Sequence, residues 1–211
     1  MGKLGLTASE VAKFIVGAYK GDNEDYTQFP LNGKMIQDRL KCNNLGVYYW
    51  EGEVDVGGKI HKVNLTGQPD RVDDDLVVEV KFGVSPEYRL YQEELAIIQS
   101  LVYTHLHQNG KQGKKIPLSQ GREFCYVVYG PESTDPADWE FNRKFIPYDS
   151  GVVYPIGEAE YFELITEASR CKLNSCLLER PKPKAEDKFH RFLLHKYIEG
   201  HMGRGFREME Y

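Results

Sequence analysis

The chain has 211 residues, of which 41% are hydrophobic and 28% charged, and it carries 27 basic against 32 acidic side chains. This composition excludes a disordered chain, and the length suffices to bury one well-packed core. The net charge of −5 excludes a uniformly basic nucleic-acid coat protein, although it permits a local basic groove. Four cysteines are too few for a disulfide scaffold. Without a signal-peptide core or a run of roughly 20 apolar residues, we expect an intracellular protein that does not enter a membrane.

The N-terminal part is predicted to begin with helices and then to change to strands. Thr7 and Glu10 have the spacing of a capping box and precede apolar residues at helical spacing, which predicts a helix over 7–19. A second, short helix is expected over 33–41. From there, alternating apolar residues interrupted by Gly and Asp clusters predict strands over 47–50, 54–56, 59–65 and 76–82.

The second half of the chain alternates between helix and strand patterns. Pro86 begins a long amphipathic helix that reaches about Gln108, and it has the most regular helical pattern in the sequence. The remaining elements are two strands and two helices, expected over 124–129, 141–146, 156–170 and 186–199.

This order of elements predicts an α/β fold with a central mixed β-sheet of about five strands flanked by α-helices. We expect a single domain spanning residues 1–211. Its core would occupy about 7–148, followed by a C-terminal helical extension over about 149–211.

Three charged side chains in and before the strand over 76–82 suggest a chemical site. On a strand, Glu79 and Lys81 share one face, so an acid and a base project side by side. If Asp73–Asp75 form a hairpin turn, Asp70 falls opposite residue 78 or 79 and its carboxylate can reach that of Glu79. Two carboxylates about 4 Å apart repel by roughly 4 kcal/mol at an effective dielectric of 20, so we expect a cation to offset the repulsion. Mg²⁺ or Mn²⁺ suits such a site.

The motif Pro69-Asp70, followed nine residues later by Glu79-Val80-Lys81, resembles the PD-(D/E)XK nuclease superfamily. This restriction-endonuclease-like family has an α/β core of the kind that the element order predicts. The resemblance implies that Asp70 and Glu79, with the backbone carbonyl of Val80, bind Mg²⁺ or Mn²⁺. It further implies that Lys81 orients the attacking water or stabilises the charge that develops on the phosphate.

The long helix strengthens the resemblance. Gln99 and Tyr103 form a QxxxY motif, placed as in the RecB-type branch of the superfamily, where this helix packs beside the active site. Gln99 and Tyr103 are therefore expected to support the site. The alternative is that they are only the boundary of an amphipathic face.

A further metal ligand is less well defined. Gly33 and Gln37 resemble the G-x-x-x-H motif of RecB-type nucleases, with Gln37 in the place of the His. An amide oxygen binds a hard cation more weakly, so Glu10 on the first helix is a second candidate. Its capping box offers Glu10 a purely structural role as well. Asp38 is a weaker candidate.

Basic residues indicate where DNA would bind. A loop without acidic residues carries Lys111, Lys114, Lys115 and Arg122, which we expect to contact phosphates. Further basic residues follow near the C-terminus: Lys182, Lys184, Lys188, Arg191, Arg204 and Arg207. For each of these, a solvated surface is the alternative.

The sequence therefore predicts a Mg²⁺- or Mn²⁺-dependent deoxyribonuclease for DNA replication, recombination or repair, in a cell, a virus or another mobile element. The sequence does not distinguish an exonuclease from a structure-selective endonuclease. A junction-resolvase-like enzyme would be a homodimer. One alternative is a catalytically inactive nucleic-acid-binding or assembly protein with the same fold. Another is an interaction protein in which Glu79 and Lys81 form only a surface ion pair.

Overall fold

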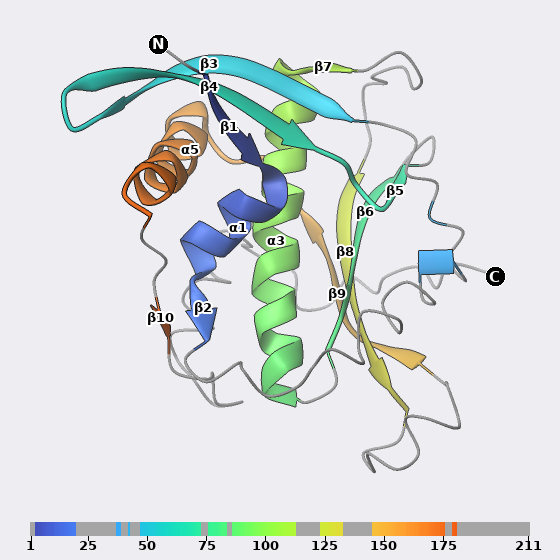
Figure 1. The fold of residues 1–211 in the computed structure, drawn as a ribbon. Coiled ribbons are helices and arrows are strands. Elements are labelled where there is room, and N and C mark those ends of the chain that lie inside the picture. Colours follow the sequence, from blue (N-terminus) through green and yellow to red (C-terminus); the bar gives the residue numbers. More distant parts are fainter. Residues whose placement is uncertain are drawn as a thin grey trace.

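The computed structural model describes residues 3–19, 37–38, 42, 47–72, 76–83, 86–112, 123–132, 145–175 and 179–180. Within these residues the chain forms two four-stranded sheets, a small two-stranded sheet and three helices (Figure 1). The α/β fold predicted from the sequence is confirmed. None of the described helices is long and apolar enough to cross a membrane.

The first sheet has the order β1-β4-β3-β7. Its strands are β1 (Leu4–Thr7), β3 (Tyr48–Val56), β4 (Lys59–Gly67) and β7 (Lys111–Gln112). Strands β3 and β4 form a long antiparallel hairpin. Its predicted turn at Gly57 and Gly58 is confirmed, with φ values of +64° and +80° that glycine adopts without strain.

The second sheet has the order β5-β6-β8-β9 and is mixed. Its strands are β5 (Arg71–Val72), β6 (Leu76–Phe82), β8 (Glu123–Pro131) and β9 (Phe145–Val153). Strand β6 is parallel to β8, and helix α3 (Pro86–Asn109) lies between them in the chain. Strands β5 and β9 are antiparallel to their neighbours.

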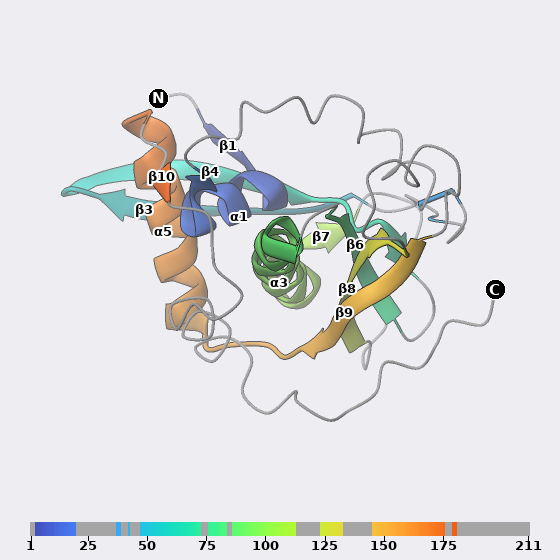
Figure 2. The same ribbon diagram turned by 90° about the horizontal axis from the view of Figure 1, so that it is seen from below.

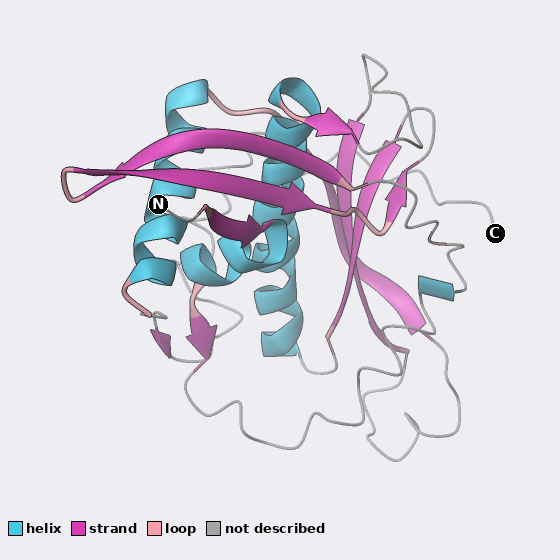
Figure 3. Cartoon of the chain, turned by 45° about the horizontal axis from the view of Figure 1, so that its top comes forward, coloured by secondary structure: helices cyan, strands magenta, loops and turns pink. Residues whose placement is uncertain are grey.

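In Figure 3 the β3–β4 hairpin crosses in front of the helices, and the small two-stranded sheet lies below it. Helix α1 (Ala8–Val16) begins with the predicted capping box: the Glu10 backbone N–H donates to Thr7 Oγ1 at 3.1 Å, and Glu10 Oε2 accepts from the Thr7 backbone N–H at 2.9 Å. Helix α5 is Glu158–Leu173. Strands β2 (Ala18–Tyr19) and β10 (Glu179–Arg180) pair in parallel.

Helix α3 lies at the centre of the main core and contacts strands of both large sheets (Figure 2). Leu101 and Leu106 on this helix are fully buried, and so are Val11 of α1 and Leu65 of β4. A second, smaller cluster lies on the other face of the β6–β8 pair, around Val78 and Val127. Strand β6 is therefore buried on both faces.

Several sequence predictions are corrected in detail. The single central sheet of about five strands is wrong, because the strands divide between two large sheets. The chain leaves β4 after Gly67, and Pro69, which lacks an N–H to donate to a strand ladder, precedes β5 in the other sheet. The first helix ends at Val16 instead of residue 19. The strand expected over 141–146 is shifted to β9, and the strands expected over 47–50 and 54–56 are one continuous strand.

The helix expected over 186–199 lies outside the described residues, and so does most of that expected over 33–41. The long helix is confirmed as α3, and the helix expected over 156–170 is confirmed as α5 with shifted ends.

Candidate active site

The β5–β6 hairpin brings the first two predicted site residues together. Arg71 pairs with Val78 and Val72 with Val77, so Asp70, just before β5, lies at the position opposite Glu79. Its carboxylate reaches across to β6, where Oδ2 accepts a hydrogen bond from the Val80 backbone N–H at 2.9 Å. The sequence left residue 78 or 79 open as the position opposite Asp70, and the strand pairing places it opposite residue 79.

Glu79 projects from β6 toward α3 and is buried, with 3% of its surface exposed. Three side chains donate hydrogen bonds to its carboxylate. Lys81 Nζ and Gln99 Nε2 approach Oε1 at 2.5 Å and 2.9 Å, and the Tyr103 hydroxyl approaches Oε2 at 2.9 Å. Gln99 and Tyr103 are four residues apart and therefore neighbours on one face of α3. The expectation that this face supports the site agrees with these contacts.

The burial of the Glu79–Lys81 pair bears on one of the alternatives. The side chains of Lys81 and Glu79 are 19% and 4% exposed, so this is not a surface ion pair. A buried carboxylate with three donors is costly to desolvate and is seldom present without a function. The surface ion pair that the interaction-protein alternative assumes is therefore not observed.

Gln37 also joins the site. Its amide Nε2 donates a hydrogen bond to Asp70 Oδ1 at 2.6 Å. Gln37, which stands where RecB-type nucleases have the His of G-x-x-x-H, therefore contacts Asp70, the first carboxylate of the Pro69-Asp70 motif. Turning the amide by 180° would present its oxygen to the same space.

Burial and the neighbouring Glu79 carboxylate both act on Asp70. The pKa of Asp70 is raised to about 7, because burial penalises its charged form and because the Glu79 carboxylate adds repulsion. The hydrogen bonds from the Val80 N–H and the Gln37 amide and the positive charge of Lys81 only partly offset these effects. A divalent cation between the two carboxylates would remove the repulsion.

Two residues beside the site were not predicted from the sequence. Cys42 lies close enough to Asp70 that burial and this carboxylate raise the pKa of its thiol to about 12. Its backbone N–H donates to the carbonyl of Gln37 at 2.9 Å. The Gln68 carbonyl lies 3.3 Å from the Tyr103 hydroxyl. A lone cysteine and a backbone carbonyl carry no sequence signal, so no pattern identifies them beforehand.

The donor set fits a hard cation held by few protein ligands. Asp70 and Glu79 offer carboxylate oxygens, and Gln37 and the Val80 backbone lie beside them. Within the described part of the chain, no three His, Cys, Asp or Glu side chains gather closely enough to hold a metal ion. Mg²⁺, which retains several water ligands and takes one or two carboxylates, suits such a set better than Zn²⁺.

Glu10 contacts Thr7 and Lys172, and its role as a metal ligand stays a prediction. Its carboxylate completes the α1 capping box and accepts a hydrogen bond from Lys172 Nζ of α5 at 2.7 Å. These contacts also lower its pKa, although burial acts in the opposite direction. The structural role left open for Glu10 is the one observed. Asp38 is exposed.

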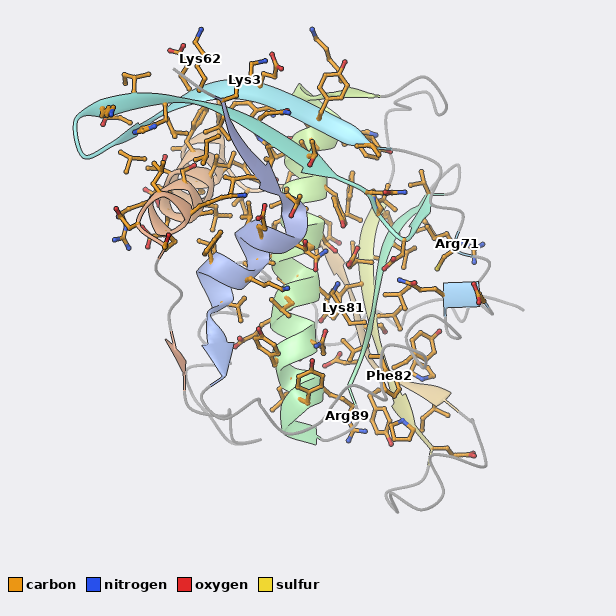
Figure 4. All side chains as sticks on the ribbon, in the orientation of Figure 1. Lys3, Lys62, Arg71, Lys81, Phe82 and Arg89 are labelled. Carbon is orange, nitrogen blue, oxygen red and sulfur yellow. The ribbon has the colours of Figure 1, made fainter. Side chains whose placement is uncertain are left out.

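The predicted DNA-binding residues are only partly described. Lys111 is exposed at the start of β7, at the edge of the first sheet. Its expected partners Lys114, Lys115 and Arg122 lie outside the described residues, as do the basic residues after position 181. Figure 4 shows that Arg71, Lys81 and Arg89 are basic side chains on and around the second sheet.

Comparisons with known proteins found little similarity. No protein-family model matches the chain, and no curated protein matches it. It is similar to the protein in a solved structure titled "Crystal structure of SSO0001", with 14% sequence identity and a TM-score of 0.42, over 80% of this chain and 76% of that one. What the protein does is therefore inferred from the residues of the site itself.

Proposed function

We propose that this protein is a Mg²⁺- or Mn²⁺-dependent nuclease that hydrolyses phosphodiester bonds in DNA. The observation that carries the proposal is the pairing of Asp70 with a buried Glu79, with Lys81 Nζ 2.5 Å from the Glu79 carboxylate. An acidic pair without a cation would repel a phosphate, whereas a cation-loaded pair with a lysine beside it attracts one.

Asp70, Glu79, the Val80 carbonyl and the Gln37 amide oxygen are the groups that would hold the cation. When bound, the cation polarises the scissile phosphate and lowers the pKa of a coordinated water. Lys81 then has a role of its own. Its ammonium group, released in part from Glu79, orients the attacking water or stabilises the negative charge on the phosphate oxygens.

Gln99 and Tyr103 are positioning residues in this scheme. Their hydrogen bonds to Oε1 and Oε2 fix the Glu79 carboxylate in one orientation. Removing a residue that orients a metal ligand by a hydrogen bond typically lowers metal affinity or activity by 10- to 100-fold.

The proposal is tested by incubating the full chain with end-labelled linear DNA, circular single-stranded DNA and a four-way junction, in Mg²⁺, Mn²⁺ or EDTA. The variant Glu79→Gln keeps the side-chain volume and loses the charge, so cleavage should fall at least about 100-fold. Glu10→Gln is the matched control, because this acid lies in the capping box, and it should cleave like the unmodified chain.

The preferred substrate separates the two modes of action. Faster cutting of linear DNA indicates an exonuclease, and cutting of the junction with a homodimer in light scattering indicates a structure-selective endonuclease. DNA retained equally in EDTA and never cut would contradict the nuclease and support the inactive DNA-binding alternative. Cleavage that survives in Glu79→Gln would also contradict the nuclease proposal.

A further inference from the structure

Strand β9 contains an irregularity that changes the direction of one aromatic side chain. Opposite β8, Val128 pairs with Asp149 and Tyr129 pairs with Pro147, so Tyr148 is an extra residue without a partner position. Bulges of this kind occur often beside active sites, where they reorient a side chain. The Tyr148 side chain is 40% exposed.

The ring of Tyr148 is nevertheless held in place on three sides. Its hydroxyl donates a hydrogen bond to the Pro131 carbonyl at 2.8 Å. The guanidinium carbon of Arg89 lies over one face, 3.5 Å from the ring centroid. At the ring edge lies Gly130, where a Cβ atom would come within 2.8 Å of the ring. These contacts involve the hydroxyl, one face and one edge of the ring, and the residue is still 40% exposed.

Arg89 lies on α3, the helix that also carries Gln99 and Tyr103. It lies in the first turns of α3 and packs on Gly83, where a Cβ atom would come within 2.7 Å of its side chain. The Gly83 N–H continues the strand by donating to the Tyr129 carbonyl at 2.9 Å. Lys81 is two residues before Gly83, and in Figure 4 Arg89 is labelled near the lower end of α3, below Lys81 and Phe82 of β6.

We propose that Tyr148 and Arg89 form a subsite that binds one unstacked base and its phosphate from a DNA single strand. The proposal rests on the proposed nuclease function, which explains why DNA would lie here. An exposed ring with one face supported by a cation offers its other face for stacking, and the guanidinium offers donors to a phosphate oxygen. In a duplex the bases are already stacked on each other, so a single strand is the matching ligand.

One acidic residue follows Tyr148 directly in the chain. Asp149 is exposed, but its Oδ1 accepts a hydrogen bond from the Ser150 backbone N–H at 2.8 Å, within its own strand. Arg89 remains the charged group in contact with the Tyr148 ring.

The test is fluorescence anisotropy with a labelled oligothymidylate of about 15 nucleotides and with a duplex of equal length, using the full chain in EDTA so that no cleavage occurs. Tyr148→Ala should weaken single-strand binding about 10-fold, and Tyr148→Phe, which keeps the ring, should weaken it less than about twofold. Tyr154→Ala is the matched control, since Tyr154 is a similarly exposed tyrosine beyond β9, at 44%, and it should bind like the unmodified chain.

Arg89→Ala provides an independent readout. Besides weakening binding, it should reduce the slope of log affinity against log salt by about 0.7, the loss of one phosphate contact on a single strand. If Tyr148→Ala does not fold by circular dichroism, Tyr148→Leu preserves apolar contact with Arg89 and should show the same loss of binding.

Each result has a definite meaning. Unchanged single-strand binding in a folded Tyr148→Ala or Tyr148→Leu overturns the subsite, and so does an equal loss in Tyr148→Phe or in Tyr154→Ala. Equal weakening on the duplex overturns the single-strand assignment. A chain that loses binding as expected but never cleaves DNA in Mg²⁺ or Mn²⁺ keeps the subsite and loses the nuclease proposal, so the two failures are distinguishable.

Discussion

At the scale of the residue, Asp70 connects the geometry of the site to a measurable pH dependence. Its pKa of about 7 lies above that of an aspartate in an unfolded chain, chiefly because of burial and then because of Glu79. Between about pH 4 and pH 7 the folded chain therefore binds more protons at Asp70 than the unfolded chain. The stability contribution of this group is present at low pH and is lost as the pH rises through that window.

We expect the free energy of unfolding in EDTA to fall between pH 4 and pH 7 more steeply for the unmodified chain than for Asp70→Asn, which has no proton to lose. Urea unfolding at successive pH values measures the difference. Adding Mn²⁺ at pH 7 should raise the melting temperature of the unmodified chain and not of Asp70→Asn, because the cation replaces the proton between the carboxylates. Parallel pH curves for the two proteins would contradict the raised pKa of Asp70.

At the scale of the element, the site depends on how closely α3 approaches the end of β4. A Cβ atom on Gly67 would come within 2.7 Å of Leu106 Cδ1 and 2.9 Å of the Tyr103 ring. Tyr103 in turn donates to Glu79, and burial with this nearby carboxylate keeps its own pKa well above the usual tyrosine range. Tyr103 is therefore a neutral hydrogen-bond donor, and its ring occupies the space that Gly67 of β4 leaves free.

Gly67→Ala should accordingly destabilise the fold by about 1–3 kcal/mol and also weaken Mn²⁺ binding about 10-fold, because Tyr103 must move away from Glu79. Gly5→Ala in β1 is the matched control, because no heavy atom lies within 4 Å of a Cβ there. Urea unfolding and calorimetric titration with Mn²⁺ measure the two effects. Lower stability with unchanged Mn²⁺ affinity would show that Tyr103 does not position Glu79.

At the scale of the whole molecule, α3 packs against both large sheets and its buried side chains belong to one core. We expect both sheets to unfold together. Leu101→Ala, at a fully buried position of α3, should cost about 2–5 kcal/mol and reduce amide-exchange protection equally in β4 and β8. The exposed Leu173→Ala should change neither. Loss of protection in one sheet alone would contradict the predicted single domain.

The elements and the motif were predictable because their signals are local. The capping box of Thr7 and Glu10, the glycine turn of the β3–β4 hairpin and the 3.6-residue period of α3 each depend on a few neighbouring residues. The alternation along β6 likewise placed Glu79 and Lys81 on one face. In contrast, the sequence left Glu10 open between a metal ligand and a capping residue, because it does not show Lys172, the partner of Glu10 on α5.

By itself, then, the amino-acid sequence predicted most of the helices and strands to within a few residues, the face of β6 that carries charge, and that Asp70 can reach Glu79 from a position opposite residue 78 or 79 of the partner strand. Only the tertiary structure decided that the strands divide into two sheets around α3, that Gln37 meets Asp70 across 33 positions of the chain, and that Arg89 covers the ring of Tyr148. The physical reason is that backbone hydrogen bonds and side-chain periodicity act over a few residues. Contacts between distant segments are selected by the packing of the whole core.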